Sequence, residues 1–171
     1  MKFHKIKSYA KINISLGVLG RLNSKLHKIE SLISFLNLYD YIFIKKIKSK
    51  SHKVVFVGKY SKRIEKKNTI YNLLKILDKR KKLKNQKYLI KVNKNIPQKS
   101  GLGGGSMNAA NVLKFLVNKQ HLKLDKDEIL QVASEIGSDV ILGMQKKTSI
   151  LYGDGKLKFL KKKNKFIYNL D

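Results

Sequence analysis

Cysteine is absent from the 171-residue sequence, and proline occurs only once, as Pro97. Without cysteine the chain can form no disulfide bond, thiolate metal site or cysteine nucleophile. The four histidines are scattered and lack the spacing of a metal site; they are His4, His27, His52 and His121. No apolar run is long enough to cross a membrane, and Lys11 and Asn13 interrupt the one that follows the basic N-terminus. We therefore expect a cytoplasmic protein without a signal peptide or a membrane partner.

Acidic residues and arginine are also scarce. The chain has 39 basic and 11 acidic residues, a formal net charge of +28, and its only arginines are Arg21, Arg63 and Arg80. Such a charge favours binding to nucleic acid. Arginine, however, is the usual reader of guanine edges and the usual bidentate clamp on phosphate. The lysines are spread along the whole chain, which is more typical of solvated surfaces than of a binding stripe. A basic RNA-binding module is therefore an alternative hypothesis, and we expect no specific nucleic-acid partner.

The N-terminal third of the chain is predicted to be β-structure, because residues 3–57 are rich in isoleucine, valine, phenylalanine and tyrosine. Residues 11–16 alternate strictly between polar and apolar side chains. Since side chains alternate across a strand, the apolar members, among them Ile14, are expected to face a core. The polar members, among them Lys11 and Asn13, are expected to share the opposite face.

Helical and strand-like segments alternate in the rest of the chain, which predicts an α+β fold with a core, since 42% of the residues are hydrophobic. A helix over 69–78 is indicated by apolar residues at helical spacing, with Asn68 as its N-cap. Asp125 and Glu128 form a capping box for a helix that ends at Gly137. The other predicted segments are a strand over 87–95, a helix over 105–119, a short apolar segment over 140–144, and strands within 148–160 and 165–170.

The most informative segment is Pro97–Ala110, in which four of the five positions 101–105 are glycine. Glycine lets the backbone come close to a partner. A loop that leads from a strand into a helix points its N–H groups, and the positive end of the helix dipole, at an anion. The segment is not a Walker A loop, because no Gly-Lys-Ser/Thr follows the glycines, and Ser106 stands where G-x-G-x-x-G has its last glycine. We expect it to bind the phosphates of a nucleotide.

Four motifs, in this order, resemble the GHMP kinase superfamily, and within it the family of kinases that act on 4-diphosphocytidyl-2-C-methyl-D-erythritol. Tyr9–Ile14 resembles P-A-K-(I/L)-N-L, and Gly20–His27 resembles G-R-x-x-D-G-Y-H. Pro97–Ala110 resembles P-x-G-x-G-L-G-G-G-S-S-N-A-A, and Gly137–Ile141 resembles G-A-D-V-P. The resemblance runs through the whole chain. It implies the α+β fold of the GHMP-kinase N-terminal domain, which is like domain 2 of ribosomal protein S5.

The resemblance also implies an activity, the ATP-dependent phosphorylation of the 2-hydroxyl of 4-diphosphocytidyl-2-C-methyl-D-erythritol in the non-mevalonate isoprenoid precursor pathway. By this resemblance Asp139 is the general base that takes the hydroxyl proton, and Lys11 keeps that carboxylate ionised and stabilises the developing alkoxide. Ser106 helps to hold Mg²⁺. The implied substrate contacts are Asn13, Leu26 and His27. The implied ATP contacts are Asn68, Pro97, Gln98, Lys99, Ser100, Gly101, Leu102, Gly103, Gly104, Gly105, Ser106 and Met107.

The sequence also departs from the family's pattern. Leu26 replaces a tyrosine, and Met107 replaces the second serine of the glycine-rich motif. The family has a C-terminal half as well, so we expect the chain to be an N-terminal fragment, a truncated gene product or a partial record that lacks the C-terminal domain. On this interpretation residues 1–160 are the ATP-binding domain and residues 161–171 begin a truncated second domain. An inactive kinase fragment is therefore a further alternative.

Overall fold

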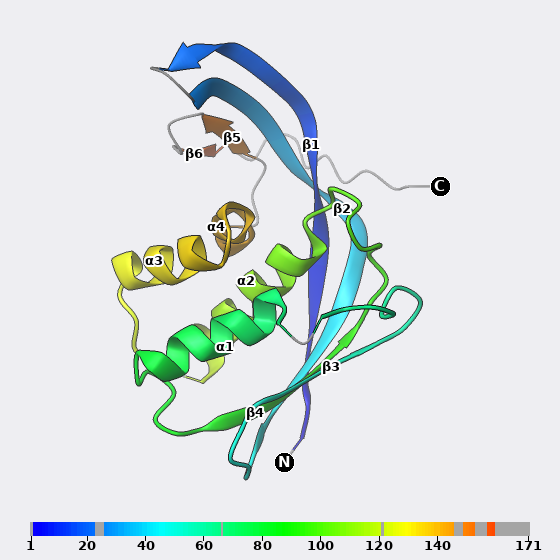
Figure 1. The fold of residues 1–171 in the computed structure, drawn as a ribbon, viewed down its shortest axis with the longest axis vertical. Helices are drawn as coiled ribbons and strands as arrows, with labels where there is room; N and C mark the ends of the chain where they lie inside the picture. The colour runs from blue at the N-terminus through cyan, green and yellow to red at the C-terminus, as the bar shows by residue number, and fades with distance from the viewer. Residues whose placement is uncertain are drawn as a thin grey trace.

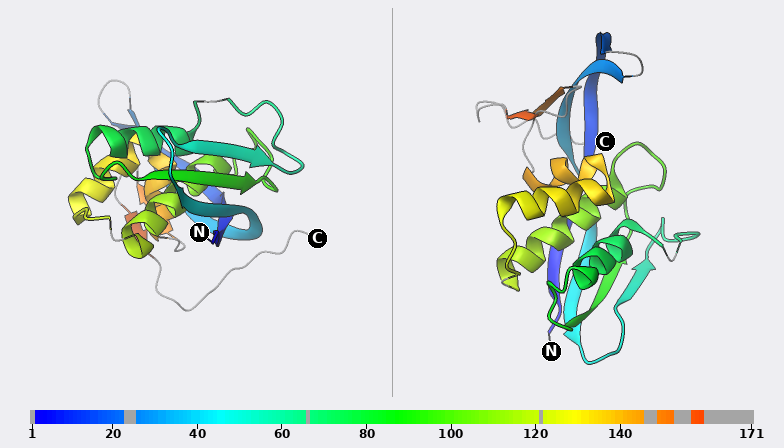
Figure 2. Two further views of the ribbon diagram at one scale, coloured as in Figure 1. Left: turned by 90° about the horizontal axis from the view of Figure 1, so that it is seen from below. Right: turned by 60° about the vertical axis from the view of Figure 1, so that its left-hand side comes forward.

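The computed structural model describes residues 2–22, 26–65, 67–120, 122–145, 149–152 and 157–159. Within them, six strands form one mixed sheet and four helices pack on one of its faces (Figures 1 and 2). The strands are β1 (His4–Leu22), β2 (Leu26–Ile47), β3 (Lys53–Val57), β4 (Lys87–Asn93), β5 (Ser149–Tyr152) and β6 (Leu157–Phe159). The helices are α1 (Thr69–Lys79), α2 (Gly104–Lys119), α3 (Lys126–Ile136) and α4 (Ser138–Gln145). This arrangement confirms the predicted α+β fold.

The sheet is built around the long antiparallel hairpin of β1 and β2. The other edge of β2 is shared by two strands: Tyr41–Ile47 pairs with β4, and Glu30–Ile33 pairs with β5, both antiparallel. β3 pairs with β4 in parallel, and α1 makes the crossover between them. The sheet order is therefore β3-β4-β2-β5-β6, with β1 on the opposite edge of β2.

The prediction for residues 11–16 was wrong at two positions, because the pairing of β1 with β2 is irregular. Lys11 is buried and forms an ion pair with α4, whereas Ile14 is 42% exposed. Ser8, three residues before Lys11, also faces the helices, since its Oγ accepts a hydrogen bond of 3.2 Å from Asn111 on α2. Strict alternation would put Ser8 and Lys11 on opposite faces. A register shift between Tyr9 and Lys11 turns both side chains toward the helices.

The two capped helices lie where the sequence predicts them. The Asn68 side chain accepts a hydrogen bond from the backbone N–H of Tyr71 at the start of α1. Both bonds of the Asp125–Glu128 capping box are present at the start of α3, which Gly137 ends. Helix α1 packs against the sheet and against α2 through the apolar residues whose spacing predicted the helix. These residues are Ile70, Leu73, Leu74 and Leu77.

Other predicted segments differ in extent. Helix α2 begins at Gly104, one residue before the predicted start. Residues 140–144, expected only as a short apolar segment, belong to α4, whose buried Val140 packs against α2 and α3. Strands β5 and β6 lie within the predicted region 148–160. The strand predicted at 165–170 and the second domain predicted at 161–171 lie outside the described residues.

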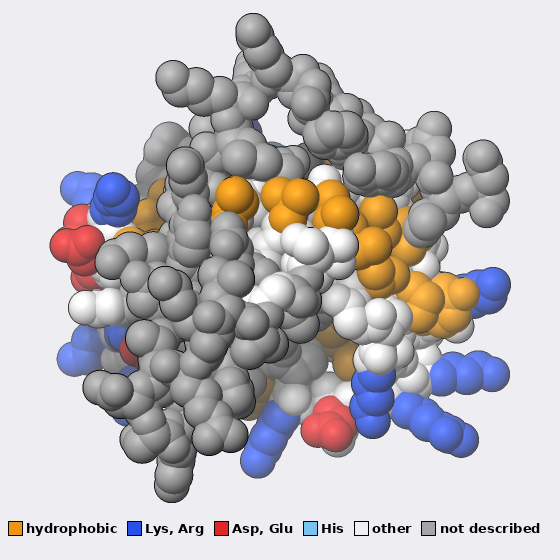
Figure 3. Space-filling view, turned by 90° about the horizontal axis from the view of Figure 1, so that it is seen from above, with side chains coloured by type: hydrophobic (Ala, Val, Ile, Leu, Met, Phe, Trp, Pro, Cys, Tyr) orange, Lys and Arg blue, Asp and Glu red, His pale blue; other side chains and the backbone are white. Residues whose placement is uncertain are grey.

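On the sheet face away from the helices, the ammonium groups of two lysines lie over tyrosine rings. Tyr39 and Tyr41 alternate with buried core residues along β2, and their ring centroids are 5.1 Å apart. Lys5 Nζ lies 3.9 Å from the centroid of Tyr41, and Lys7 Nζ lies 4.3 Å from that of Tyr39. Figure 3, which looks down from the top of Figure 1, shows basic side chains around the rim of the molecule, beside a hydrophobic band. On this sheet face two of the lysines are thus engaged with tyrosine rings.

Helices α4 and α2 cross at close range, which predicts a stability effect at Gly143. A Cβ at this position would lie 2.5 Å from the Ala110 Cβ, whereas a Cβ at Gly105 would lie 3.4 Å from the Thr69 Oγ1. We expect Gly143→Ala to lower the free energy of unfolding by about 1–3 kcal/mol through overpacking. Gly105→Ala, also helical, should be neutral or stabilising by up to about 1 kcal/mol. Urea unfolding of both variants measures this, and equal stability of the two would contradict it.

The environment of His52 predicts how the stability of the protein depends on pH. Its Nδ1 accepts the backbone N–H of Tyr88 at 3.0 Å, so the ring's proton is on Nε2, which lies 3.1 Å from Asp78 Oδ2. Burial lowers the pKa of His52 below its usual value, and the Asp78 carboxylate opposes this shift only in part. The unfolded state therefore takes up the proton more readily than the folded state. The contribution of neutral His52 to the free energy of unfolding should therefore be complete above about pH 6.5. It should decline as pH falls below about 6.5 and through the lower pKa that His52 has in the folded state.

Urea unfolding between pH 8 and pH 5 measures this dependence. We expect the decline in stability to be flatter in His52→Gln, whereas His4→Gln, at an exposed histidine, should keep the wild-type decline. If His52→Gln shows the same dependence of stability on pH as the wild type, other groups cause the decline.

Candidate active site

Lys11 and Asp139 come together although they are 128 positions apart in the chain. The Lys11 Nζ is 3.3 Å from Asp139 Oδ2, and the two side chains are 7% and 34% exposed. The lysine comes from β1, and the aspartate from the first turn of α4, where the helix dipole favours a negative charge. Asn13 Oδ1 accepts a second hydrogen bond of 3.2 Å from the same Nζ. A buried cation is thus held next to a carboxylate that remains open to solvent on one side.

The glycine loop lies directly against this pair. The backbone N–H of Lys11 donates to the carbonyl of Leu102 at 3.0 Å. Gly103, the N-cap of α2, has φ +65°, and a Cβ there would lie 2.8 Å from Lys11 Cγ and 3.5 Å from Asp139 Oδ2. Only glycine fits both the left-handed backbone and this close approach. The loop and the Lys11–Asp139 pair therefore form one site at the N-terminus of α2.

The N-terminus of α1 joins the site from the other side. Thr69 Oγ1 donates to the carbonyl of Gly105 at 2.8 Å, which ties the first turn of α1 to that of α2. Asn68, predicted to lie near an adenosine, immediately precedes this contact and caps α1 with its Oδ1. The free N–H groups of two helix N-termini thus lie close together, an arrangement that attracts anions.

The outer part of the loop is tied to the segment that follows β3. Gln98 Nε2 donates to the carbonyls of Tyr60 and Lys62 at 2.7 and 2.6 Å. Ser100 Oγ donates to the carbonyl of Pro97 at 2.9 Å. These contacts engage two of the predicted ATP-binding side chains within the protein and give the loop a fixed shape.

Not all predicted site residues lie at the open side of the loop. The Met107 side chain is buried among Ile33 and Leu142, and its N–H donates to the carbonyl of Gly103 at 2.8 Å. Ser106 is half-buried in the first turn of α2. Lys99 is exposed, with φ +54°.

The predicted substrate contacts are only partly brought together. Asn13 lies beside Lys11, as described above. The backbones of Leu26 and His27 begin β2 and pair with Leu22 and Arg21, near the closed end of the hairpin. The side chains of Leu26 and His27 lie outside the part of the structure that is described.

A buried polar cluster beneath the loop was not predicted. Asp40, Lys94 and Asn108 are almost completely buried and contact one another through hydrogen bonds and an ion pair. The sequence carries one signal for them, which is a charged residue within the otherwise apolar strand around Asp40. Their contact joins three segments that are far apart in the chain, which no local pattern reveals.

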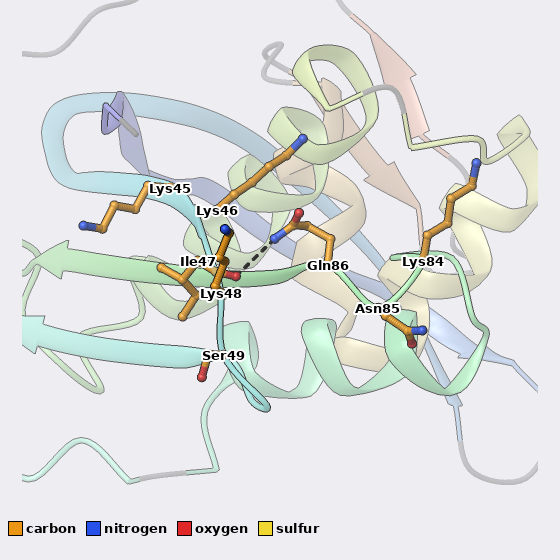
Figure 4. Close-up of a pocket in the computed structure, with 8 residues that line it drawn as sticks. All are labelled: Lys45, Lys46, Ile47, Lys48, Ser49, Lys84, Asn85 and Gln86. Carbon is orange, nitrogen blue, oxygen red and sulfur yellow. Dashed lines mark hydrogen bonds between the residues drawn. The ribbon is translucent and has the colours of Figure 1, made fainter.

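A separate hollow of about 660 Å³ lies between the end of β2 and the residues just before β4, away from the glycine loop (Figure 4). Its lining includes Lys45, Lys46, Lys48 and Lys84. Their side chains point in different directions, and the Gln86 amide donates to the carbonyl of Ile47 (Figure 4). The lysines therefore do not converge on a common ligand position.

The described residues contain no group of three or more histidine, aspartate or glutamate side chains that could hold a metal ion. None of the helices in the described ranges is both long enough and apolar enough to cross a membrane.

Comparison with known proteins shows the family to which the chain belongs. Residues 68–153, which include the glycine loop and Asp139, match the model of the GHMP kinases N terminal domain. The chain belongs to the GHMP kinase family. This confirms the resemblance drawn from the four motifs and the predicted N-terminal domain fold.

Two curated relatives are named 4-diphosphocytidyl-2-C-methyl-D-erythritol kinase. The protein of Pelagibacter ubique (strain HTCC1062) is 54% identical over 166 residues, which are 97% of this chain and 59% of the relative. The protein of Clostridioides difficile (strain 630) is 33% identical over 161 residues, 91% of this chain and 52% of the relative. The chain thus spans about half the length of the curated relatives it matches.

Two solved structures of small-molecule kinases share the fold. A crystal structure of 4-(cytidine 5'-diphospho)-2C-methyl-D-erythritol kinase matches with a TM-score of 0.75 and 27% identity, over 92% of this chain and 55% of that one. A homoserine kinase from Cytophaga hutchinsonii matches with a TM-score of 0.62 at 15% identity, over 94% of this chain and 52% of that one, which shows the fold alone.

Proposed function

We propose that this chain carries the ATP-phosphate site and the catalytic pair of a kinase that phosphorylates the 2-hydroxyl of 4-diphosphocytidyl-2-C-methyl-D-erythritol. The observation that carries the proposal is the Lys11–Asp139 pair, 3.3 Å apart and in contact with the glycine loop at Gly103. The proposed base, its lysine partner and the proposed phosphate-binding loop would thus act within one site. The names of the relatives support the choice of substrate and of the isoprenoid precursor pathway.

In this proposal Asp139 removes the proton from the 2-hydroxyl as its oxygen attacks the γ-phosphorus of ATP. The bond between the γ-phosphorus and the bridging oxygen breaks, and ADP leaves with that oxygen. Lys11 pairs with the Asp139 carboxylate before the step and stabilises the negative charge on the attacking oxygen during it. Because Lys11 is buried, its charge is screened less by water than that of a surface lysine.

The glycine loop would hold the phosphates with backbone N–H groups at the N-terminus of α2. Phosphoryl transfer depends mostly on positioning and on neutralising charge, which such a loop supplies. Mg²⁺, when bound, would neutralise phosphate charge. The described residues offer no cluster of acidic side chains for it, so phosphate oxygens would be its main ligands, and we assign the Ser106 hydroxyl, in the first turn of α2, as a further ligand.

The RNA-binding alternative receives less support. The matched relatives are named as kinases. The large positive charge predicts weak binding to any polyanion at low salt, and such binding falls steeply as salt rises. Binding that persists at physiological salt would be needed to favour this alternative.

The first test is ADP release by the purified chain from ATP and Mg²⁺, with and without 4-diphosphocytidyl-2-C-methyl-D-erythritol. We expect release that depends on this substrate. Nucleotide binding is measured in parallel by calorimetry, since it tests the glycine loop independently of turnover. Equal release with and without the substrate would contradict the proposed acceptor. A folded chain that binds no ATP would contradict the proposed phosphate site.

A further inference from the structure

One buried carboxylate contacts both ends of the glycine loop. Asp40, in β2, is fully buried. Its Oδ1 accepts the backbone N–H groups of Asn95 and Ile96 at 2.8 and 2.9 Å. Its Oδ2 accepts the Asn108 side-chain amide at 2.8 Å and forms an ion pair with Lys94 Nζ. Four donors from two segments therefore converge on a single side chain.

These two segments are the entry to the loop and the exit from it. Residues 94–96 connect β4 to the loop, and Asn108 lies in the first turns of α2, after the glycines. The cluster lies directly under the first turn of α2, because a Cβ on Gly104 would be 3.2 Å from Lys94 Nζ and 3.0 Å from Ile96 Cγ2. Asp40 thus fixes how far apart the loop's two ends lie and how they are oriented.

Stability alone does not account for charges at this place. A buried ion pair has a large desolvation cost, and a well-packed apolar cluster of the same volume is often as stable or more stable. Hydrogen bonds, in contrast, specify direction and distance, which apolar contacts do not. Asp40 accepts two backbone N–H groups that precede the loop and one side-chain amide that follows it, so its geometry sets that of the loop.

We propose that Asp40 is a positioning residue for the phosphate-binding loop, holding its two ends in the binding geometry before the nucleotide arrives. This rests on the proposed function, since the loop's ligand is taken to be ATP. A loop that is already ordered loses less freedom on binding and presents its N–H groups at fixed positions. Removing Asp40 should therefore loosen the loop and weaken nucleotide binding.

The test compares Asp40→Asn with two other variants. In Asp40→Asn the ammonium of Lys94 loses its carboxylate, while one oxygen remains to accept hydrogen bonds. Asn108→Ala removes only the tie to α2 and leaves the Asp40–Lys94 ion pair in place, so it is informative even where Asp40→Asn does not fold. Asp78→Asn is the control, because it breaks another aspartate–lysine pair, with Lys87, at the opposite end of α1 from the loop.

Two readouts are measured on the folded full chain, amide hydrogen exchange and the dissociation constant for ATP. For Asp40→Asn we expect exchange over residues 94–108 to accelerate by about tenfold or more, with no change over α3. The dissociation constant for ATP should rise about tenfold or more. Asn108→Ala should give a smaller effect in the same direction, and Asp78→Asn should leave both readouts unchanged.

Loop exchange that stays at the wild-type rate in both loop variants would overturn the proposal, whatever their melting temperatures. If the wild-type chain binds no ATP, the proposed function fails, while the exchange measurement still decides whether Asp40 orders the loop. The two failures are therefore distinguishable.

Discussion

Asp139→Asn is expected to lower substrate-dependent ADP release by about 10²–10⁴-fold, the usual contribution of a general base. Asparagine keeps the size of the side chain, but its amide cannot take the proton of the 2-hydroxyl. The affinity for ATP should change little, because the contacts of Gly103 and Gly105 do not require the carboxylate's charge. Steady-state turnover and calorimetric nucleotide binding measure the two effects separately.

Asp127→Asn is the matched control for this prediction. Asp127 also lies in the first turn of a helix, α3, where its charge favours the helix in the same way. It has no contact with Lys11 or with the glycine loop among the interactions of the described residues. Full turnover in Asp127→Asn with little in Asp139→Asn would support the assignment of the base. Turnover retained in both would remove Asp139 from the proposed mechanism.

The fold could be predicted from the sequence where local patterns decide the structure. The spacing of apolar residues and the caps at Asn68 and Asp125 place α1 and α3 to within a residue or two, because each cap satisfies its own helix. The face to which Lys11 points could not be predicted this way. It depends on a register shift between β1 and β2, and pairing between strands is not visible in the alternation of one strand.

The candidate site was predictable to the same extent. The order of the motifs indicated that Lys11, the glycine loop and Asp139 act together, and the structure places them in contact. The Asp40 cluster could not be found in this way, because its members come from β2, from the end of β4 and from α2. Sequence motifs therefore indicated the residues proposed to touch ATP and substrate, and the structure was needed to find those that support them.

Gly103→Ala is expected to disrupt the site far more than Gly101→Ala. Both glycines have positive φ, at +65° and +75°, so either alanine has a backbone cost of about 1–2 kcal/mol. Only at Gly103 does the added Cβ meet another group, lying 2.8 Å from Lys11 Cγ, while nothing lies within 4 Å at Gly101. Since Lys11 must shift to make room and it is paired with Asp139, turnover should fall at least about tenfold more in Gly103→Ala. Equal turnover in the two variants would contradict this.

A double-mutant cycle shows whether the effect at Gly103 arises from Lys11. Lys11→Ala removes the Cγ and Cε atoms that the new Cβ would meet at 2.8 and 3.1 Å. In the Lys11→Ala background, the loss of stability from Gly103→Ala should therefore shrink to that of Gly101→Ala. A coupling free energy of about 1–3 kcal/mol between positions 11 and 103, with none between 11 and 101, is the expected result of urea unfolding. Independent effects at positions 11 and 103 would mean that the loop does not rest on the Lys11 side chain. The backbone hydrogen bond from Lys11 to Leu102 would then be left to hold the phosphate loop against the Lys11–Asp139 pair.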